Sequence, residues 1–195
     1  EHRKWTNFFE MYLQTWKLYR LIGEKNVDYS EEDKEKVIGA YDSSIRYADL
    51  FFGKILKDLE EFDPVFIVNA DHGEAFFERN VFGHFFPYLY EENVHVPWII
   101  HNADRREDID EPVSLMDLYS TVLDLADSSD SGSLSLPGED GDFVVTKDIC
   151  FREGRQRIGV RLGRWKYIFG HGDGGELYDL ENDPIELHNL AQDPA

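Results

Sequence analysis

Apolar residues recur at helical spacing in three stretches of the chain. In residues 4–22, aromatic side chains fall every three or four positions, which predicts a helix with a heavy aromatic face. A second helix is predicted from Ser30, an N-cap that three acidic residues follow, to about Glu61. Residues 112–127 predict a third helix, which opens on a Ser-x-x-Asp pattern close to a capping box.

Short apolar runs between and after these helices predict strands. Val65–Val68 is an unbroken β-branched and aromatic run, which is typical of a strand buried on both faces. Val94–Asn102 predicts a second strand. Further along, the segments RIGVRLGRWKYIF and ELYDL predict short antiparallel strands with a glycine turn between the two segments. The order of these elements predicts an α/β body followed by a small antiparallel β unit.

The length of the chain, 195 residues, suits one domain with an appendage. The Gly-, Ser- and Asp-rich stretch at 129–142 is the clearest boundary, because turn-forming residues gather there and no periodic pattern crosses it. We therefore expect the α/β domain over residues 1–128 and the β unit with its tail over residues 143–195.

The charge of the chain is strongly negative. It has 40 Asp and Glu residues against 20 Lys and Arg residues, for a net charge of −20. Such a surface repels nucleic acid and anionic membranes, so we expect neither as a partner. The balance favours a halophilic protein that stays hydrated in high salt, with an ordinary acidic mesophilic protein as the alternative.

Hydropathy and cysteine content add two expectations. No apolar run approaches the roughly 20 residues that cross a bilayer, which favours a soluble, cytoplasmic chain. The only cysteine, Cys150, excludes an internal disulfide. We expect its side chain to be a small apolar strand residue rather than a reactive group.

The residues that carry chemistry begin where the first predicted strand ends. The segment VNADHGEAF places Asp71 and His72 directly after the apolar run, at the end of a strand where α/β sheets bind their ligands. Successive strand side chains point to opposite faces, so both residues can face one metal only if the chain bends, which Gly73 makes easy. By itself, the pair fits either a loop hydrogen-bond pair or the edge of a metal site.

Other motifs surround this strand end in a set order. After ADHGE come FGHFFPYLYEENVHVPWII, RWKYIF and ELYDLENDPIELHNLA, and the predicted helix before it carries YDSSIRYADLFFGKILKDLEEF. This order resembles the sulfatase family of the alkaline phosphatase superfamily over about residues 37–191. The resemblance implies a sulfatase-like sheet flanked by helices, of which this chain holds a part.

The resemblance implies roles for individual residues. Asp71 and His72 match two ligands of the family's divalent metal, often Ca²⁺, which prefers oxygen donors, although the imidazole also admits Mn²⁺ or Zn²⁺. His84 matches a catalytic His or Lys that meets sulfate or phosphate oxygens and stabilises charge on the leaving group. Glu74 is expected either to orient a ligand or to be a solvated carboxylate.

Three other matches carry weaker expectations. His95 stands where many relatives have Arg before Val-Pro, which weakens any role for it. Arg164 and Lys166 match the family's late strand, and we expect both to be charges on a strand surface.

Three family features are absent from the sequence. The nucleophile motif C/S-x-P-x-R, whose Cys or Ser becomes formylglycine, has no counterpart, because Cys150 lies in CFREG. The early Asp-Asp pair and the HxP segment are also missing. The sequence therefore predicts the C-terminal portion of a sulfatase-like enzyme, with its nucleophile in a missing N-terminal half.

Three functions stay open at this point. The first is hydrolysis of the sulfate ester of a small molecule or sugar by the completed, metal-dependent enzyme. The second keeps the fold but cleaves phosphodiesters or phosphonates, or transfers phosphoryl groups, with a Thr or Ser nucleophile. The third is a catalytically inactive half-domain with a binding role.

Overall fold

The chain forms two compact units. In a computed structural model, the first comprises Glu1–Pro64 with Gly73–Phe85, and the second comprises Val65–His72 with Phe86–Ala195. The structure describes residues 29–84, 88–103, 108–126, 143–150, 155–170 and 173–192. The helix expected at 4–22 and the loop expected at 129–142 lie outside these ranges.

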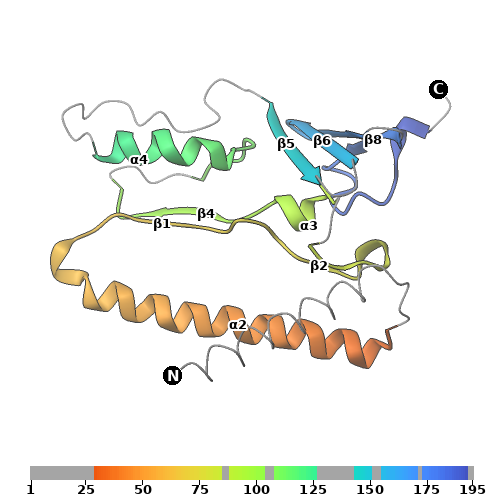
Figure 1. The fold of residues 1–195 in the computed structure, drawn as a ribbon. Coiled ribbons are helices and arrows are strands. Elements are labelled where there is room, and N and C mark those ends of the chain that lie inside the picture. The colour runs from red at the N-terminus through yellow and green to blue at the C-terminus, as the bar shows by residue number, and fades with distance from the viewer. Residues whose placement is uncertain are drawn as a thin grey trace, which may run out of the picture. The chain divides into compact units, whose positions relative to one another are not determined.

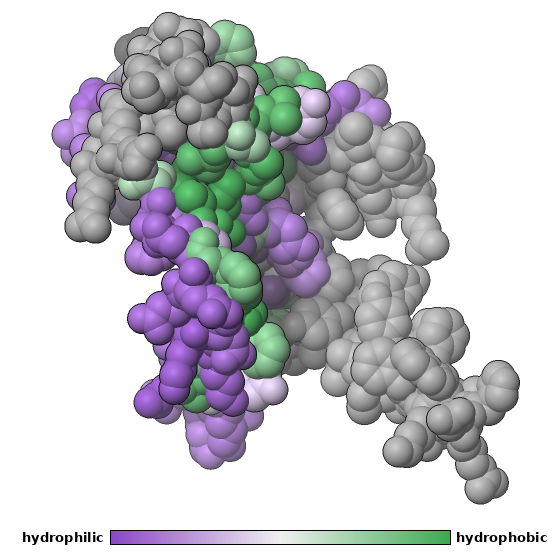
Figure 2. Space-filling model, turned by 90° about the vertical axis from the view of Figure 1, so that its left-hand side faces the viewer, coloured by the Kyte–Doolittle hydropathy of each residue, from purple (hydrophilic) through white to green (hydrophobic). Residues whose placement is uncertain are grey.

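The first unit is dominated by the helix α2, Glu31–Asp58, drawn in orange in Figure 1. The side chain of Ser30 accepts a hydrogen bond from the Asp33 backbone N–H, and acidic residues fill the first turn, which confirms the predicted start. No residue within α2 is buried. Apolar residues of α2, such as Ile45 and Phe51, are more than half exposed. Figure 2 shows apolar residues of the molecule open to view beside hydrophilic ones.

A small hairpin completes the described part of this unit. The strand β2, Ala75–Phe76, pairs antiparallel with β3, Phe82–Gly83. Between them, Phe77 has a φ of 74°, and its ring stacks on Phe82 with 5.4 Å between the centroids. Aromatic packing of this kind stabilises the hairpin. The short 3₁₀ turns of this unit are η1, Glu60–Phe62, and η2, Glu78–Asn80.

In the second unit, β1 (Phe66–Asn69) pairs antiparallel with β4 (Trp98–His101). The first three residues of β1 are half-buried and Asn69 is exposed, so the expectation of a strand buried on both faces is wrong. The reason is that β4 is its one paired neighbour among the described residues. The second predicted strand is shorter than expected, since the helix α3 (Glu91–Val94) ends at its first residue and β4 begins only at Trp98.

The third predicted helix is present. A 3₁₀ turn, η3 (Leu115–Asp117), leads into the helix α4 (Leu118–Ala126). The Ser114 hydroxyl accepts from a backbone N–H of this turn, and the Asp117 carboxylate accepts from the Ser114 N–H, which confirms the capping box. None of the helices in the described ranges combines the length and the apolar character that crossing a bilayer requires.

The predicted antiparallel unit is a four-stranded sheet in the order β5-β6-β7-β8, coloured cyan to blue in Figure 1. Every neighbouring pair is antiparallel, which confirms the antiparallel strands, and the turn between β6 and β7 contains Gly163 at a φ of 53°. The glycine turn expected between the two segments lies partly outside the described residues. A short 3₁₀ turn, η4 (Leu190–Gln192), follows the sheet. The strands are β5 (Val144–Cys150), β6 (Arg155–Leu162), β7 (Trp165–Gly170) and β8 (Asp173–Asp179).

The core of the second unit joins this sheet to the segment that contains α3. Leu89 and Tyr90 pack against Ile168 of β7 and Tyr178 of β8, and all four are buried. Side chains of β7 alternate, so that Ile168 faces this core while its aromatic neighbours are exposed on the opposite face. The sheet is therefore fixed by one apolar face.

A buried ion cluster reinforces the same contact. The Lys166 ammonium lies 2.9 Å from a carboxylate oxygen of Glu91 and 2.9 Å from one of Glu186, and its side chain is 3% exposed. Glu186 also accepts the Glu91 backbone N–H at 2.6 Å. The expectation of a surface charge is wrong for Lys166, because α3 covers this face of β7. Arg164 is 45% exposed, as expected of a surface charge, but it lies in the turn between β6 and β7 and not on a strand.

A second polar network lies beside the first. The Glu176 carboxylate accepts hydrogen bonds from the hydroxyls of Tyr90 and Tyr178, each at 2.9 Å, and pairs with Arg157. Burial, and then the bond to Glu176, raises the pKa of Tyr178 far above its ordinary value, so the phenol stays a donor. Two polar networks and an apolar core therefore attach the C-terminal sheet to residues 88–94.

Gly170 marks a close approach within the sheet. A Cβ at this position would lie 2.9 Å from the Gln156 carbonyl oxygen and 3.0 Å from Arg157 Cγ. Because the nearest atom is backbone, Gly170→Ala should lower the free energy of unfolding by about 1–3 kcal/mol, measured by urea denaturation. Gly174→Ala is the matched control, since no atom lies within 4 Å of its Cβ. Equal stability of the two variants would contradict this account.

Candidate active site

Asp71 and His72 lie directly after β1, where the chain bends out of the strand. Asp71 Oδ1 accepts the His72 backbone N–H at 3.0 Å, and Asp71 Oδ2 lies 3.8 Å from His72 Nε2. The side chains are 90% and 43% exposed, respectively. Leaving the strand therefore lets a carboxylate and an imidazole approach one another, which the alternation of a regular strand would prevent.

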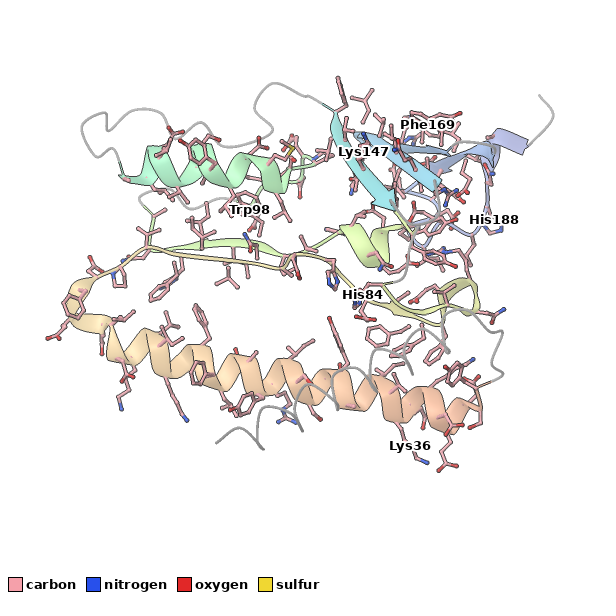
Figure 3. All side chains as sticks on the ribbon, in the orientation of Figure 1. Lys36, His84, Trp98, Lys147, Phe169 and His188 are labelled. Carbon is pink, nitrogen blue, oxygen red and sulfur yellow. The ribbon has the colours of Figure 1, made fainter. Side chains whose placement is uncertain are left out.

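Glu74 and His84 form a second pair in the first unit. The last pairing of the hairpin ladder is Ala75 with Gly83, so Glu74 and His84 stand at the next opposite positions. Glu74 Oε2 lies 3.0 Å from His84 Nδ1, which is hydrogen-bond distance. Figure 3 labels His84 where β3 ends. The pairing follows from the register of two very short strands.

The two partners differ in burial. The Glu74 side chain is 12% exposed and that of His84 is 43% exposed. Glu74 is therefore not a solvated carboxylate. Its other oxygen, Oε1, is buried and has no hydrogen-bond partner among the described residues. A buried carboxylate oxygen without a donor is costly, which is typical of a functional position.

A divalent cation suits the donors that Asp71 and His72 present. The exposed carboxylate offers the oxygen that Ca²⁺ prefers, and an imidazole nitrogen is also a ligand of Mn²⁺ or Zn²⁺. Two donors make up only part of the roughly six to eight contacts that Ca²⁺ takes. These residues therefore fit one edge of a metal site that needs further ligands.

The remaining candidates lie apart from these pairs in the sequence. His95 ends α3, is 73% exposed, and has its Nδ1 3.6 Å from Glu91. Arg164 lies over the Trp165 ring, 4.8 Å from its centroid, and contacts Glu181. The Cys150 backbone ends β5. None of these contacts assigns a chemical role to the three residues.

The chain combines helices and strands with an antiparallel four-stranded C-terminal sheet, and an Asp-His pair follows the end of β1. The sequence profile of the family described as Sulfatase matches residues 9–128, more than half of the chain. This chain belongs to the sulfatase family, whose members are typically metal-dependent.

Curated relatives are similar along most of this chain. Choline-sulfatase of Rhizobium meliloti (strain 1021) is 28% identical over 192 residues, covering 87% of this chain and 36% of that protein. Arylsulfatase K of Mus musculus is 27% identical, covering 84% of this chain and 34% of that protein. The chain therefore spans about a third of the length of these relatives.

Solved structures share the fold. A 2-O GAG sulfatase superposes with a TM-score of 0.70 at 25% identity, over 85% of this chain and 41% of that one. The phosphonate monoester hydrolase of Agrobacterium radiobacter superposes with a TM-score of 0.68 at 24% identity, over 85% and 39% of the two chains. The second likeness concerns the fold alone.

Sequence reasoning named Glu74 and His84 separately but missed their contact. The sequence did contain a hairpin signal, because Ala75-Phe76 and Phe82-Gly83 lie on either side of a short turn. A hairpin at this place puts Glu74 opposite His84. Each strand has only two residues, which is too short for residue alternation to predict a strand. The ion cluster of Lys166 was also missed, although the residue shares its strand face with Ile168.

Proposed function

We propose that this chain is part of a metal-dependent hydrolase of sulfate esters, the substrate being a small-molecule or sugar sulfate. Membership of the sulfatase family, with Asp71 and His72 exposed at the end of β1 inside the matched region, carries the proposal. The nucleophile is supplied by polypeptide outside the 195 residues, as the family's formylglycine motif.

In this proposal, Asp71 and His72 hold one edge of a divalent metal site, with Ca²⁺ as the first candidate. The metal, when bound, polarises the ester oxygens. His84 then stabilises or protonates the oxygen of the leaving alcohol. Its 43% exposed ring is accessible to a substrate, which supports this role.

Complementation tests the proposal. The chain is joined to an upstream segment that carries C/S-x-P-x-R, converted to formylglycine, and a chromogenic sulfate ester is assayed. We expect metal-dependent turnover above that of the same fusion carrying Asp71→Ala. Equal rates in the two fusions would count against a sulfatase.

The phosphonate monoester hydrolase fold keeps a second function open. In that case, the completed enzyme carries a Thr or Ser nucleophile and prefers phosphodiesters or phosphonates. Matched sulfate, phosphate and phosphonate esters of one chromogenic alcohol separate the two proposals by their ratios of kcat/KM.

The His84→Ala variant of the completed enzyme should lose about 10²–10⁴ in kcat, because the leaving oxygen loses its proton donor. His188→Ala is the control, since that imidazole is 82% exposed and lies near Asp183 in the C-terminal tail. The measurement is the steady-state rate with an ester of a poor leaving group. A near-normal rate in His84→Ala would remove this residue from the mechanism.

Metal binding also distinguishes an active member from an inactive half-domain. If Asp71 and His72 bind Ca²⁺ in the completed enzyme, where the further ligands are present, adding it at about 100 times Kd should raise the free energy of unfolding by roughly 2.7 kcal/mol. The measurement is thermal unfolding with Ca²⁺ and with EDTA, and Asp71→Ala should lose the difference. An inactive half-domain predicts the same melting temperature under all these conditions.

A further inference from the structure

The contact between Glu74 and His84 points to a role for the glutamate that family membership does not assign. We propose that Glu74 is a positioning residue, whose carboxylate fixes the His84 ring through Nδ1 so that Nε2 meets the ester oxygen. The catalytic part of this inference rests on the proposed function, whereas the orientation of the ring does not.

Backbone geometry brings the two side chains together. Glu74 immediately precedes β2 and His84 immediately follows β3, one position beyond the pair Ala75–Gly83. Opposite residues on neighbouring strands have their Cβ atoms about 4.5–5.5 Å apart. A carboxylate and an imidazole at these positions are within reach of one another, and the observed Oε2–Nδ1 distance is 3.0 Å.

The burial of the two side chains indicates which one orients the other. Glu74 is the more buried partner, at 12% exposure against 43% for His84. Among the described residues, the contact with His84 is the one hydrogen bond found for the Glu74 side chain. The buried carboxylate is therefore the anchor, and the more accessible imidazole is the group that it orients.

The hydrogen bond with Glu74 determines which nitrogen of the His84 ring carries a proton. An acceptor-only carboxylate at Nδ1 requires a proton there, which settles the tautomer of a neutral imidazole. In the doubly protonated ring, Nε2 gives its proton to the leaving alkoxide. The Nε2–H bond breaks, the alcohol O–H bond forms, and the ring remains with Nδ1–H bonded to Glu74. Loss of Glu74 removes this control without removing the imidazole.

The tautomer is measured first, on the chain itself. Long-range ¹H–¹⁵N NMR correlations report which ring nitrogen carries the proton, and His84→Gln identifies the His84 signals. We expect the Nδ1-protonated pattern in the wild type and its loss in Glu74→Ala. Glu78→Gln, a carboxylate change within the same hairpin, is the control and should leave the pattern unchanged. The same His84 tautomer in wild type and Glu74→Ala would overturn the proposal.

Kinetics of the completed enzyme give the second measurement. Glu74→Ala should lower kcat about 10–100-fold with KM nearly unchanged. Glu74→Gln should recover part of this loss, because the amide oxygen still accepts from Nδ1. The double variant Glu74→Ala/His84→Ala should be no slower than His84→Ala alone, since residues that act as a unit are not additive. Additive losses would overturn the positioning role.

Failure of the proposed function gives a different result. If the completed wild-type enzyme does not turn over sulfate esters, the function is wrong. The NMR comparison then still decides whether Glu74 orients His84.

Discussion

Replacing Lys166 with alanine should lower the free energy of unfolding by about 3–5 kcal/mol, because the change leaves the buried Glu186 carboxylate without its cation, whereas Glu91 keeps Arg161 at 2.8 Å. Lys166 is the shared partner of Glu91 and Glu186, each 2.9 Å away, and the Glu186 side chain is fully buried. Urea denaturation monitored by tryptophan fluorescence measures the effect. A loss below about 1 kcal/mol would show that the cluster contributes little.

A lysine in the same sheet provides the control for this substitution. Lys147 lies on β5 and is exposed (Figure 3), so Lys147→Ala should change stability by no more than about 0.5 kcal/mol. The comparison separates loss of the buried ion cluster from loss of any positive charge in this acidic chain.

The effect of Lys166→Ala should also depend on pH. Burial raises the pKa of Glu186, an effect that Lys166 opposes, so removing Lys166 raises this pKa further. A carboxyl with a raised pKa in the folded state favours folding below its unfolded pKa and loses this contribution as pH rises through the folded pKa. The variant should therefore be more destabilised at pH 8 than at pH 5. A difference that grows towards acid would contradict the role of Glu186.

Asp71→Ala should reduce turnover of the completed enzyme by about 10³-fold or more, because a metal ion contributes several kcal/mol of transition-state stabilisation. The Asp71 side chain is 90% exposed, so its loss should leave the stability of the metal-free chain unchanged. Rates and urea denaturation of the same preparations are measured together. A fall in rate that follows a fall in stability would contradict the ligand role.

Asp42→Ala is the matched control for Asp71→Ala. Asp42 is an exposed aspartate on α2 and should affect neither the rate nor stabilisation by Ca²⁺. If Asp71→Ala keeps both the rate and the stabilisation by Ca²⁺, Asp71 is not a metal ligand, whatever the result with His84.

Local chemistry explains which elements could be predicted. The start of α2 depends on Ser30 and the acidic turn after it, and the start of α4 depends on the capping box at Ser114. Both signals act over three or four residues, so the sequence contains all that is needed.

Burial was predictable only where the partner surface could be inferred. The apolar run in β1 indicated a fully buried strand, yet within the described ranges it has one paired neighbour and half-buried side chains. Lys166 has the residue type of a surface position, yet it is buried. Its position depends on Glu91, which lies 75 residues away in the sequence.

The sequence by itself determined the family, the helix starts, the antiparallel C-terminal strands, and the Asp71–His72 pair at a strand end. These follow from residue type and short spacing. Only the tertiary structure decided that Glu74 bonds to His84 and that Lys166 lies between two glutamates. Both contacts depend on strand register and on packing between distant segments, which no local pattern encodes.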